Sequence, residues 1–181
     1  MAKISVLGAG SWGTALAVVL HKNGHEVTIW SIAQDEIDML KKEREHKDKL
    51  PGVKIAEEIG LTTDLKEAIS GRDMLVVAVP SPYIRSTAKS MAPYVEDGQL
   101  LVSVAKGIEE GTLMTLSAIL EQEIPQAEVA VLCGPSHAAS CYRRIRVRPP
   151  FRPPARSRFL RMPQAPCQAH PGWCRHAALH S

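Results

Sequence analysis

Short apolar segments alternate with segments of helical periodicity over residues 3–133 of the chain. A parallel sheet that is covered on both faces needs strands that are apolar throughout, whereas the covering helices need only one apolar face. The order strand, helix, strand then predicts right-handed crossovers and a doubly wound α/β domain. Five strands are expected, at Ile4–Leu7, Val27–Trp30, Met74–Val79, Leu100–Val104 and Val129–Leu132.

The segments between these strands carry signals for helix ends. Asp35 and Asp64 stand where an N-terminal cap belongs, and Asp64 with Glu67 has the spacing of a capping box. Gly24 stands where a left-handed residue would end the first helix. The expected helices run from Thr14 to Asn23, from Asp35 to about Glu45, between Asp64 and Gly71, after Pro80-Ser81-Pro82 to about Met91, and along a stripe of Leu113, Leu116, Ile119 and Leu120.

A glycine-rich motif, Gly8-Ala9-Gly10-Ser11-Trp12-Gly13, joins the first strand to the first helix. In this context the G-x-G-x-x-G spacing is typical of a dinucleotide-binding loop rather than of a turn without a ligand. Gly8 permits the tight turn, Gly10 lets the backbone approach a pyrophosphate, and Gly13 lets the helix pack close to the strand. The N–H groups at the start of the helix would face the phosphates.

The end of the second strand does not decide between NAD and NADP. An acidic residue there would bond the ribose 2′-hydroxyl of NAD, and an arginine would receive the 2′-phosphate of NADP. The segment reads Trp30-Ser31-Ile32, with neither, and Asp35 is interpreted as a helix cap. Trp30 is expected to pack against the adenine or the core. The prediction is therefore NAD or NADP, without a preference.

Three further loops leave the carboxyl ends of predicted strands, where ligands bind in open doubly wound sheets. Lys106 could hold a substrate oxygen or an anionic group, or be a solvated surface lysine. Ser136 and His137 could donate hydrogen bonds, although a lone loop histidine is more often structural than an acid–base catalyst. The lack of a G-x-S-x-G elbow argues against a serine hydrolase. The loops are Pro80-Ser81-Pro82, Ala105-Lys106-Gly107 and Gly134-Pro135-Ser136-His137-Ala138.

Four motifs resemble, in order and spacing, those of the bacterial NAD(P)-dependent glycerol-3-phosphate dehydrogenases. They are Gly8–Ala17, Ala78–Ser81, Ala105–Glu109 and Gly134–Ala138. The resemblance covers residues 1–138 and implies a Rossmann-like domain of a cytoplasmic enzyme. The family interconverts sn-glycerol 3-phosphate and dihydroxyacetone phosphate by hydride transfer, for glycerophospholipid synthesis.

The resemblance also implies roles for single residues. It places Lys106, Gly134 and Ser136 at the small-molecule substrate. Full-length relatives are expected to be homodimers, with no metal, nucleic acid or membrane partner. The residues placed at the NAD or NADP cofactor are Gly8, Gly10, Ser11, Trp12, Gly13, Lys106 and Ala138.

The sequence departs from the family pattern in two places. Members often carry arginine where Ile32 stands, which weakens any preference for NADP. After Ala138 the family continues with an acidic helix and a helical second domain, which supplies the general-base lysine and the groups that grip the substrate phosphate. No lysine follows Lys106 in this chain, so the catalytic residue stays unknown and the chain is expected to be truncated and inactive.

Composition changes sharply after residue 138. Residues 1–138 hold 13 basic and 19 acidic residues, a net charge of −6, whereas residues 139–181 hold nine arginines and no acid. Seven of the 13 prolines lie between Pro149 and Pro171, so residues 139–181 are expected to be a disordered tail, or the product of a frameshift. Binding of nucleic acid or anionic lipid by the arginines is the alternative. A zinc site is a weaker one, because its four candidate ligands match no familiar spacing. They are Cys167, His170, Cys174 and His176.

Other classes of protein fit the sequence less well. The longest apolar runs have six residues, far short of a membrane span, and the start has no signal-peptide layout. Cys133, alone among residues 1–138, fits a reducing cytoplasm. A non-catalytic dinucleotide-binding module with a basic tail stays open, as does another two-domain hydroxy-acid dehydrogenase. Trp12 and the Lys106-Gly107 pair argue against the latter.

Overall fold

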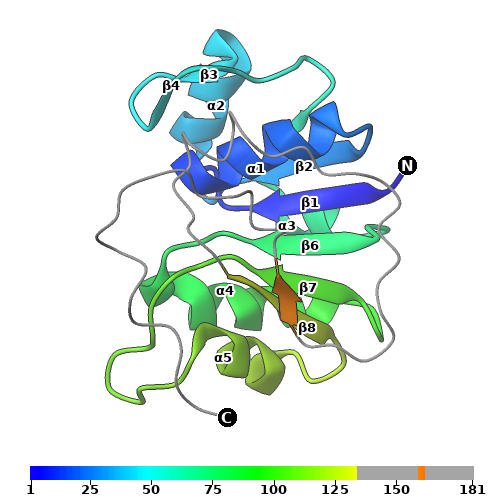
Figure 1. Ribbon diagram of the computed structural model, residues 1–181, viewed down its shortest axis with the longest axis vertical. Coiled ribbons are helices and arrows are strands. Elements are labelled where there is room, and N and C mark those ends of the chain that lie inside the picture. Colours follow the sequence, from blue (N-terminus) through cyan, green and yellow to red (C-terminus); the bar gives the residue numbers. More distant parts are fainter. Residues whose placement is uncertain (134–158, 162–181) are drawn as a thin grey trace, which may run out of the picture.

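The computed structural model describes residues 1–133 and 159–161, which form a parallel sheet with helices on both of its faces (Figure 1). The strand order is β5-β2-β1-β6-β7-β8-β9, and every neighbouring pair is parallel. Strands β2 and β5 lie on one side of β1 and strands β6 to β9 on the other, so the direction in which successive strands are added reverses between β1 and β6. This reversal confirms the doubly wound α/β fold. The strands are β1 (Lys3–Leu7), β2 (Glu26–Trp30), β5 (Gly60–Thr62), β6 (Met74–Val77), β7 (Leu100–Ser103), β8 (Glu128–Cys133) and β9 (Phe159–Arg161).

Helices and one small hairpin connect the strands. The helices are α1 (Ser11–Lys22), α2 (Gln34–Glu43), α3 (Leu65–Ile69), α4 (Ile84–Met91) and α5 (Leu116–Glu123), with the 3₁₀ turns η1 (Ser81–Tyr83) and η2 (Ala92–Tyr94) at the two ends of α4. The hairpin pairs β3 (Glu45–His46) with β4 (Leu50–Lys54) and lies beside α2 (Figure 1).

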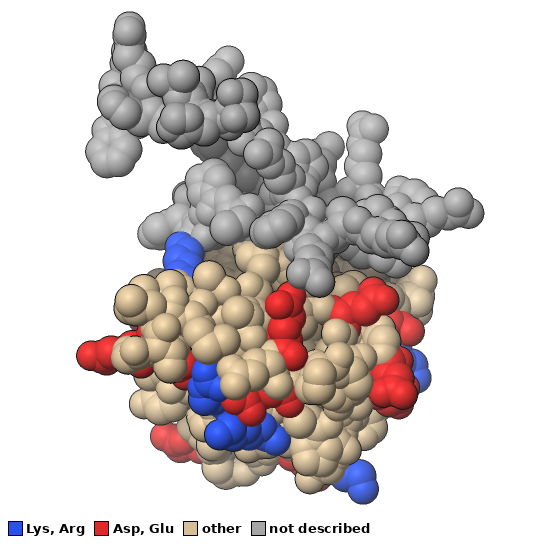
Figure 2. All heavy atoms as spheres, turned by 90° about the horizontal axis from the view of Figure 1, so that it is seen from below, with Lys and Arg blue, Asp and Glu red and all other residues tan. Residues whose placement is uncertain are grey.

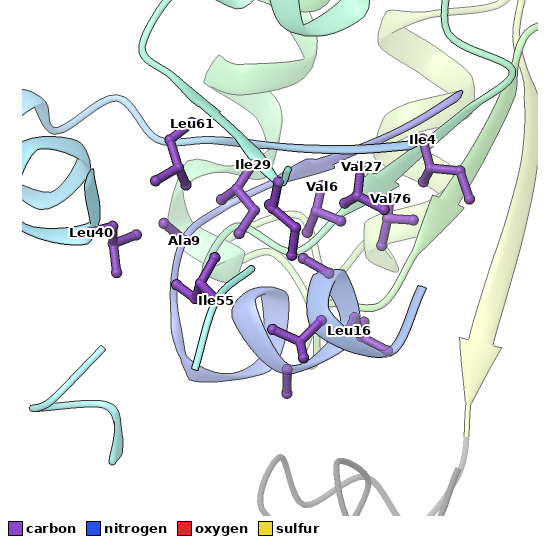
Figure 3. Packing of buried hydrophobic residues seen from close by; sticks show 14 of the residues in the cluster. Ile4, Val6, Ala9, Leu16, Val27, Ile29, Leu40, Ile55, Leu61 and Val76 are labelled. Atoms are coloured by element: carbon purple, nitrogen blue, oxygen red, sulfur yellow. The ribbon is translucent and has the colours of Figure 1, made fainter. Parts of the chain in front are cut away.

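Each face of the sheet has its own hydrophobic core, because successive strand residues point to opposite faces. In β6, Val76 belongs to one core while Leu75 and Val77 belong to the other. The first core packs the sheet against α1, α2 and the segment around β4, including Leu16 and Ile55 (Figure 3). The second core packs the sheet against α3, α4 and α5. The central strands are therefore covered on both sides, as their unbroken apolar pattern predicts.

The expected helix ends need three corrections. Helix α1 begins at Ser11, three residues before the predicted start, because the glycine motif itself supplies its first turn. Asp35 does not cap α2: Ala33 holds the N-cap position and Asp35 lies in the first turn. Leu113 precedes α5, is 72% exposed and has a positive φ of 57°, so only Leu116, Ile119 and Leu120 form the buried stripe.

Asp64 caps α3 as predicted, by accepting hydrogen bonds from the N–H groups of Lys66 and Glu67. The reciprocal half of a capping box is missing. The Glu67 carboxylate accepts instead from the Thr62 hydroxyl at 2.6 Å, and the Thr62 oxygen accepts from the Asp64 N–H at 3.0 Å. The cap therefore also ties the start of α3 to the end of β5.

Four strands were not predicted: β3, β5 and β9, which have two or three residues and are too short to show a period, and β4, whose five residues include Pro51 and Gly52. Strand β5 has three residues and β3 has two, so pairing with a neighbour defines them. Strand β9 lies in the range predicted to be without regular structure, and it pairs with the otherwise open edge of β8. The remaining residues of the predicted tail, 139–158 and 162–181, lie outside the described part of the chain, and so does the predicted boundary at residue 138.

The described surface has mixed charge. On the face seen from below in Figure 2, the side nearest α5, acidic and basic side chains lie next to one another. No helix in the described ranges is long and apolar enough to cross a membrane, in line with the short apolar runs of the sequence.

Candidate functional site

The glycine-rich loop lies where the order of the sheet reverses, between β1 and β6. The Gly8 N–H donates to the Trp30 carbonyl at 2.8 Å, and the Ala78 N–H donates to the Leu7 carbonyl at 2.8 Å. These bonds hold the carboxyl ends of β1, β2 and β6 side by side. In open α/β sheets the crevice at such a reversal is where ligands bind.

The three glycines of the motif meet different surroundings. Gly8 has a φ of +120°, and a Cβ there would lie 2.7 Å from the Ala78 carbonyl oxygen. A Cβ on Gly13 would lie 2.0 Å from the Gly8 carbonyl oxygen, so only glycine lets α1 approach the loop. A Cβ on Gly10 would meet no heavy atom within 4 Å, so its place opens outward from the described residues. Gly8 and Gly13 thus shape the loop, and Gly10 leaves room in front of it.

The start of α1 is fitted for an anion. Gly10 occupies the N-cap position and has no side chain to cap the helix, and the first turn holds no acidic residue. The first N–H groups of a helix lack intrahelical partners and lie at the positive end of its dipole. The buried Thr14 hydroxyl donates to the Ala9 carbonyl at 3.1 Å and thereby holds the turn of the loop against α1. A pyrophosphate placed before Gly10 would meet these N–H groups.

The loop that follows β7 converges on the same edge of the sheet. The Val104 N–H donates to the Val77 carbonyl at 3.1 Å, which brings the ends of β6 and β7 together. Gly107 has a φ of +112°, and a Cβ on it would lie 3.4 Å from the Ser81 hydroxyl. The predicted loops at Pro80-Ser81-Pro82 and Ala105-Lys106-Gly107 are therefore neighbours. Lys106 stands on the exposed side of this junction.

An ion-pair network that the sequence analysis missed holds the segment after Lys106. Arg85 of α4 binds the Glu109 carboxylate through two hydrogen bonds, of 2.6 Å from Nε and 2.7 Å from Nη2, and also pairs with Glu123 of α5. The Arg85 guanidinium, followed by a hydrogen bond from Thr112, lowers the pKa of Glu109 to about 2. Glu109 is therefore charged at neutral and mildly acidic pH, and the loop stays anchored to both helices.

The end of β2 carries a second polar network. Trp30 is buried and packs in the second core, one of the two places predicted for it, and it donates its indole N–H to the Thr63 carbonyl at 3.0 Å. Ser31 is buried and donates its hydroxyl to Glu36 at 2.6 Å. Ile32, by contrast, is 85% exposed.

The two networks join residues that are far apart in the sequence, so local sequence patterns do not predict them. Arg85 and Glu109 are 24 residues apart, and Glu36 reaches His46 and Lys49 at separations of 10 and 13. Alone, each charged residue looks like part of a solvated surface. No local motif marks either network.

The third predicted loop lies outside the described residues. Gly134, Ser136, His137 and Ala138 belong to it, so their predicted contacts with substrate and cofactor stay predictions. The candidate zinc ligands of residues 167–176 lie outside as well. Within residues 1–133 and 159–161, no group of three or more histidine, cysteine or acidic side chains is arranged to hold a metal ion.

A surface hollow of about 310 Å³ lies at the opposite, amino edge of the sheet. Four carboxylates and a single arginine line it, a composition unsuited to a phosphate. The charged residues are Arg72, Asp73, Glu96, Asp97 and Glu128. The glycine loop and the Lys106 loop therefore remain the candidate site.

Known proteins are similar to this chain in both sequence and fold. The N-terminus of NAD-dependent glycerol-3-phosphate dehydrogenase is the family whose model matches residues 3–145. The glycerol-3-phosphate dehydrogenase (NAD(P)+) of Agathobacter rectalis is 61% identical over 138 residues, which cover 76% of this chain and 41% of that protein. The enzyme of the same name from Fusobacterium nucleatum is 52% identical over 140 residues, covering 76% of this chain and 42% of that protein.

A crystal structure of glycerol-3-phosphate dehydrogenase from Coxiella burnetii matches with a TM-score of 0.73 and 32% identity, over 78% of this chain and 43% of that one. The chain thus spans about two fifths of the length of the relatives it matches. The match falls on the domain that carries the glycine loop. The chain therefore belongs to the NAD-dependent glycerol-3-phosphate dehydrogenase family, which it resembles over the N-terminal, NAD(P)-binding domain.

Proposed function

We propose that this chain provides the coenzyme-binding half of an NAD(P)-dependent glycerol-3-phosphate dehydrogenase. The observation that carries the proposal is the glycine loop at the reversal of the sheet, where Gly8 and Gly13 fit only without a side chain and Gly10 opens outward. NAD or NADP supplies the hydride acceptor when it is bound. The chain's part is to hold the pyrophosphate at the start of α1, beside Ser11 and Trp12.

The substrate would be a small phosphorylated alcohol or ketone, sn-glycerol 3-phosphate or dihydroxyacetone phosphate. Lys106 would contact both substrate and coenzyme, because its loop adjoins the loop that follows β6. The Arg85–Glu109 pair would keep that loop in place. Gly134 and Ser136 would complete the substrate side, with Ala138 at the coenzyme.

The organisation of the whole protein is part of the same proposal. Residues 1–138 would form the NAD(P)-binding domain, and residues 139–181 a tail of different origin. The location would be the cytoplasm, and full-length relatives would act as homodimers, without nucleic acid or a membrane as partner. General-base catalysis would come from a second domain, since this chain has no lysine after Lys106.

Coenzyme binding and turnover, measured separately on the 181-residue chain, test the proposal. NADH titration, followed by coenzyme fluorescence and by calorimetry, should show saturable binding. With dihydroxyacetone phosphate added, turnover should stay about 10²- to 10⁴-fold below that of ordinary dehydrogenases, because no lysine follows Lys106 to supply the proton of the new hydroxyl. Lack of NADH binding at millimolar concentration would contradict the proposal.

Replacing Lys106 should weaken binding without loosening the fold. Lys106→Ala removes an ammonium from an exposed loop, so the dissociation constant for NADH should rise by about tenfold, the size expected for a charged hydrogen bond. The melting temperature should stay within about 2 °C of the parent, because exposed positions contribute little to stability. Lys89→Ala, which removes an exposed lysine from α4, is the matched control and should leave both quantities unchanged. Equal NADH affinities for the parent and Lys106→Ala would mean that Lys106 does not contact the coenzyme.

A further inference from the structure

The polar network at the end of β2 lies next to the position where the adenosine ribose of a coenzyme binds in this fold. Ser31 directly follows β2, whose last carbonyl, that of Trp30, accepts from Gly8 of the phosphate loop. With the pyrophosphate at the start of α1, the ribose 2′ position falls beyond the end of the second strand. What stands there decides whether a 2′-hydroxyl or a 2′-phosphate is accepted.

Ser31 can offer a ligand only an acceptor. Its hydroxyl proton goes to Glu36 at 2.6 Å, and its oxygen accepts the Ala33 N–H at 3.3 Å. A hydroxyl has one proton and two lone pairs, so a single lone pair remains. That lone pair can receive the proton of a ribose 2′-hydroxyl. It offers nothing to a phosphate, whose oxygens are themselves acceptors.

Glu36 holds the Ser31 proton firmly because it stays ionised. Its carboxylate also accepts from His46 Nε2 at 3.2 Å and from Lys49 Nζ at 2.5 Å. Burial alone would raise the pKa of Glu36, but the hydrogen bonds from Lys49, Ser31 and His46 bring it below the ordinary value. The orientation of the Ser31 hydroxyl is thus fixed by a charged partner.

The two basic side chains of the network, His46 and Lys49, already have partners within it. His46 is 2% exposed, its Nδ1 accepts the Lys49 N–H at 3.3 Å, and its Nε2 lies 3.2 Å from the Glu36 carboxylate, so both ring nitrogens already have partners. The Lys49 charge is matched by Glu36, which it would have to leave in order to reach a phosphate. Residues 32–36 contain two acids and no base, and the first turn of α2 therefore repels an anion that its dipole would otherwise attract.

We propose that Ser31, oriented by Glu36, makes this chain select NAD(H) over NADP(H). The proposal rests on the proposed function, because it requires a dinucleotide at the glycine loop. Ser31 is the residue that would touch the ribose, and Glu36 is a positioning residue that acts through it. Ile32 adds to the selection by presenting an exposed apolar side chain where a cation would receive a 2′-phosphate.

Parallel titrations of the 181-residue chain with NADH and NADPH test this selection. The parent should bind NADH at least about tenfold more tightly than NADPH, since one mismatched charged contact amounts to about a decade in affinity. Glu36→Gln should narrow this ratio by about threefold or more, because it frees Lys49 and the Ser31 proton. Asp38→Asn makes the same change of charge on the exposed side of α2 and should leave the ratio unchanged.

Two further variants keep the test decisive if Glu36→Gln fails to fold. Ser31→Ala should weaken NADH binding while leaving NADPH binding nearly as it was. Ile32→Arg, at an exposed position, should tighten NADPH binding by about tenfold and hardly affect NADH. Equal affinity of the parent for both coenzymes, or a ratio that Ser31→Ala and Ile32→Arg leave unchanged, would overturn the selection while NADH binding still upholds the proposed function. Binding of neither coenzyme would overturn both.

Discussion

Gly10→Val should abolish NADH binding while the protein stays folded. The backbone at Gly10 has φ −65° and ψ 177°, which any residue can adopt, and a Cβ there meets no heavy atom within 4 Å. The new side chain would instead fill the space that a pyrophosphate needs, so the dissociation constant should rise by about 100-fold or more. Fluorescence titration of the parent and the variant measures this change.

Urea unfolding supplies the control for Gly10→Val. Valine is a poor N-cap residue, so the free energy of unfolding should fall, but by no more than about 1 to 2 kcal/mol. A folded variant that binds NADH like the parent would refute the assignment of the phosphate loop. A variant with both binding and stability lost would show that Gly10 is needed for the turn itself.

Gly13→Ala should have the opposite effect and impair the fold. The added Cβ would lie 2.0 Å from the Gly8 carbonyl oxygen, so α1 or the loop must move by more than 1 Å from its place. Both elements are held by the buried core around Leu16, which cannot shift without losing packing. The free energy of unfolding should fall by about 3 kcal/mol or more, measured by urea denaturation.

Gly10→Ala is the matched control for Gly13→Ala, because it adds the same methyl group three residues away. With open space around it, this change should alter the free energy of unfolding by no more than about 1 kcal/mol. Similar losses for both variants would show that the glycines matter through backbone flexibility rather than through contact. The contrast between the two positions is the specific expectation of this loop geometry.

The main elements of the fold followed from local sequence. Continuous apolar runs predicted β1, β2, β6, β7 and β8, because a strand covered on both faces has no polar side. The glycine motif predicted the turn and the start of α1, since Gly8 and Gly13 stand where a side chain has no room. Asp64 likewise marked the start of α3.

Only the tertiary structure decided the elements and contacts that depend on distant partners. Strand β5 is three residues long and is defined by pairing with β2. The N-cap position of α2 falls on Ala33 rather than on Asp35, and the Ala33 N–H donates to the Ser31 hydroxyl oxygen just before the helix begins. The Arg85–Glu109 pair depends on how α4 faces the Lys106 loop.

The sequence by itself therefore determined strands β1, β2, β6, β7 and β8 and the glycine-rich loop, where the requirement is local: an apolar run, or a backbone position without room for a side chain. Tertiary structure decided the part of the candidate site that we propose selects the coenzyme. Ser31 and Glu36 do not stand out in the sequence; the turn into α2 brings their side chains together, and the hairpin brings His46 and Lys49 to the same carboxylate. A hydrogen-bond network needs its members within about 3 Å of one another, and sequence spacing does not fix such distances between separate elements.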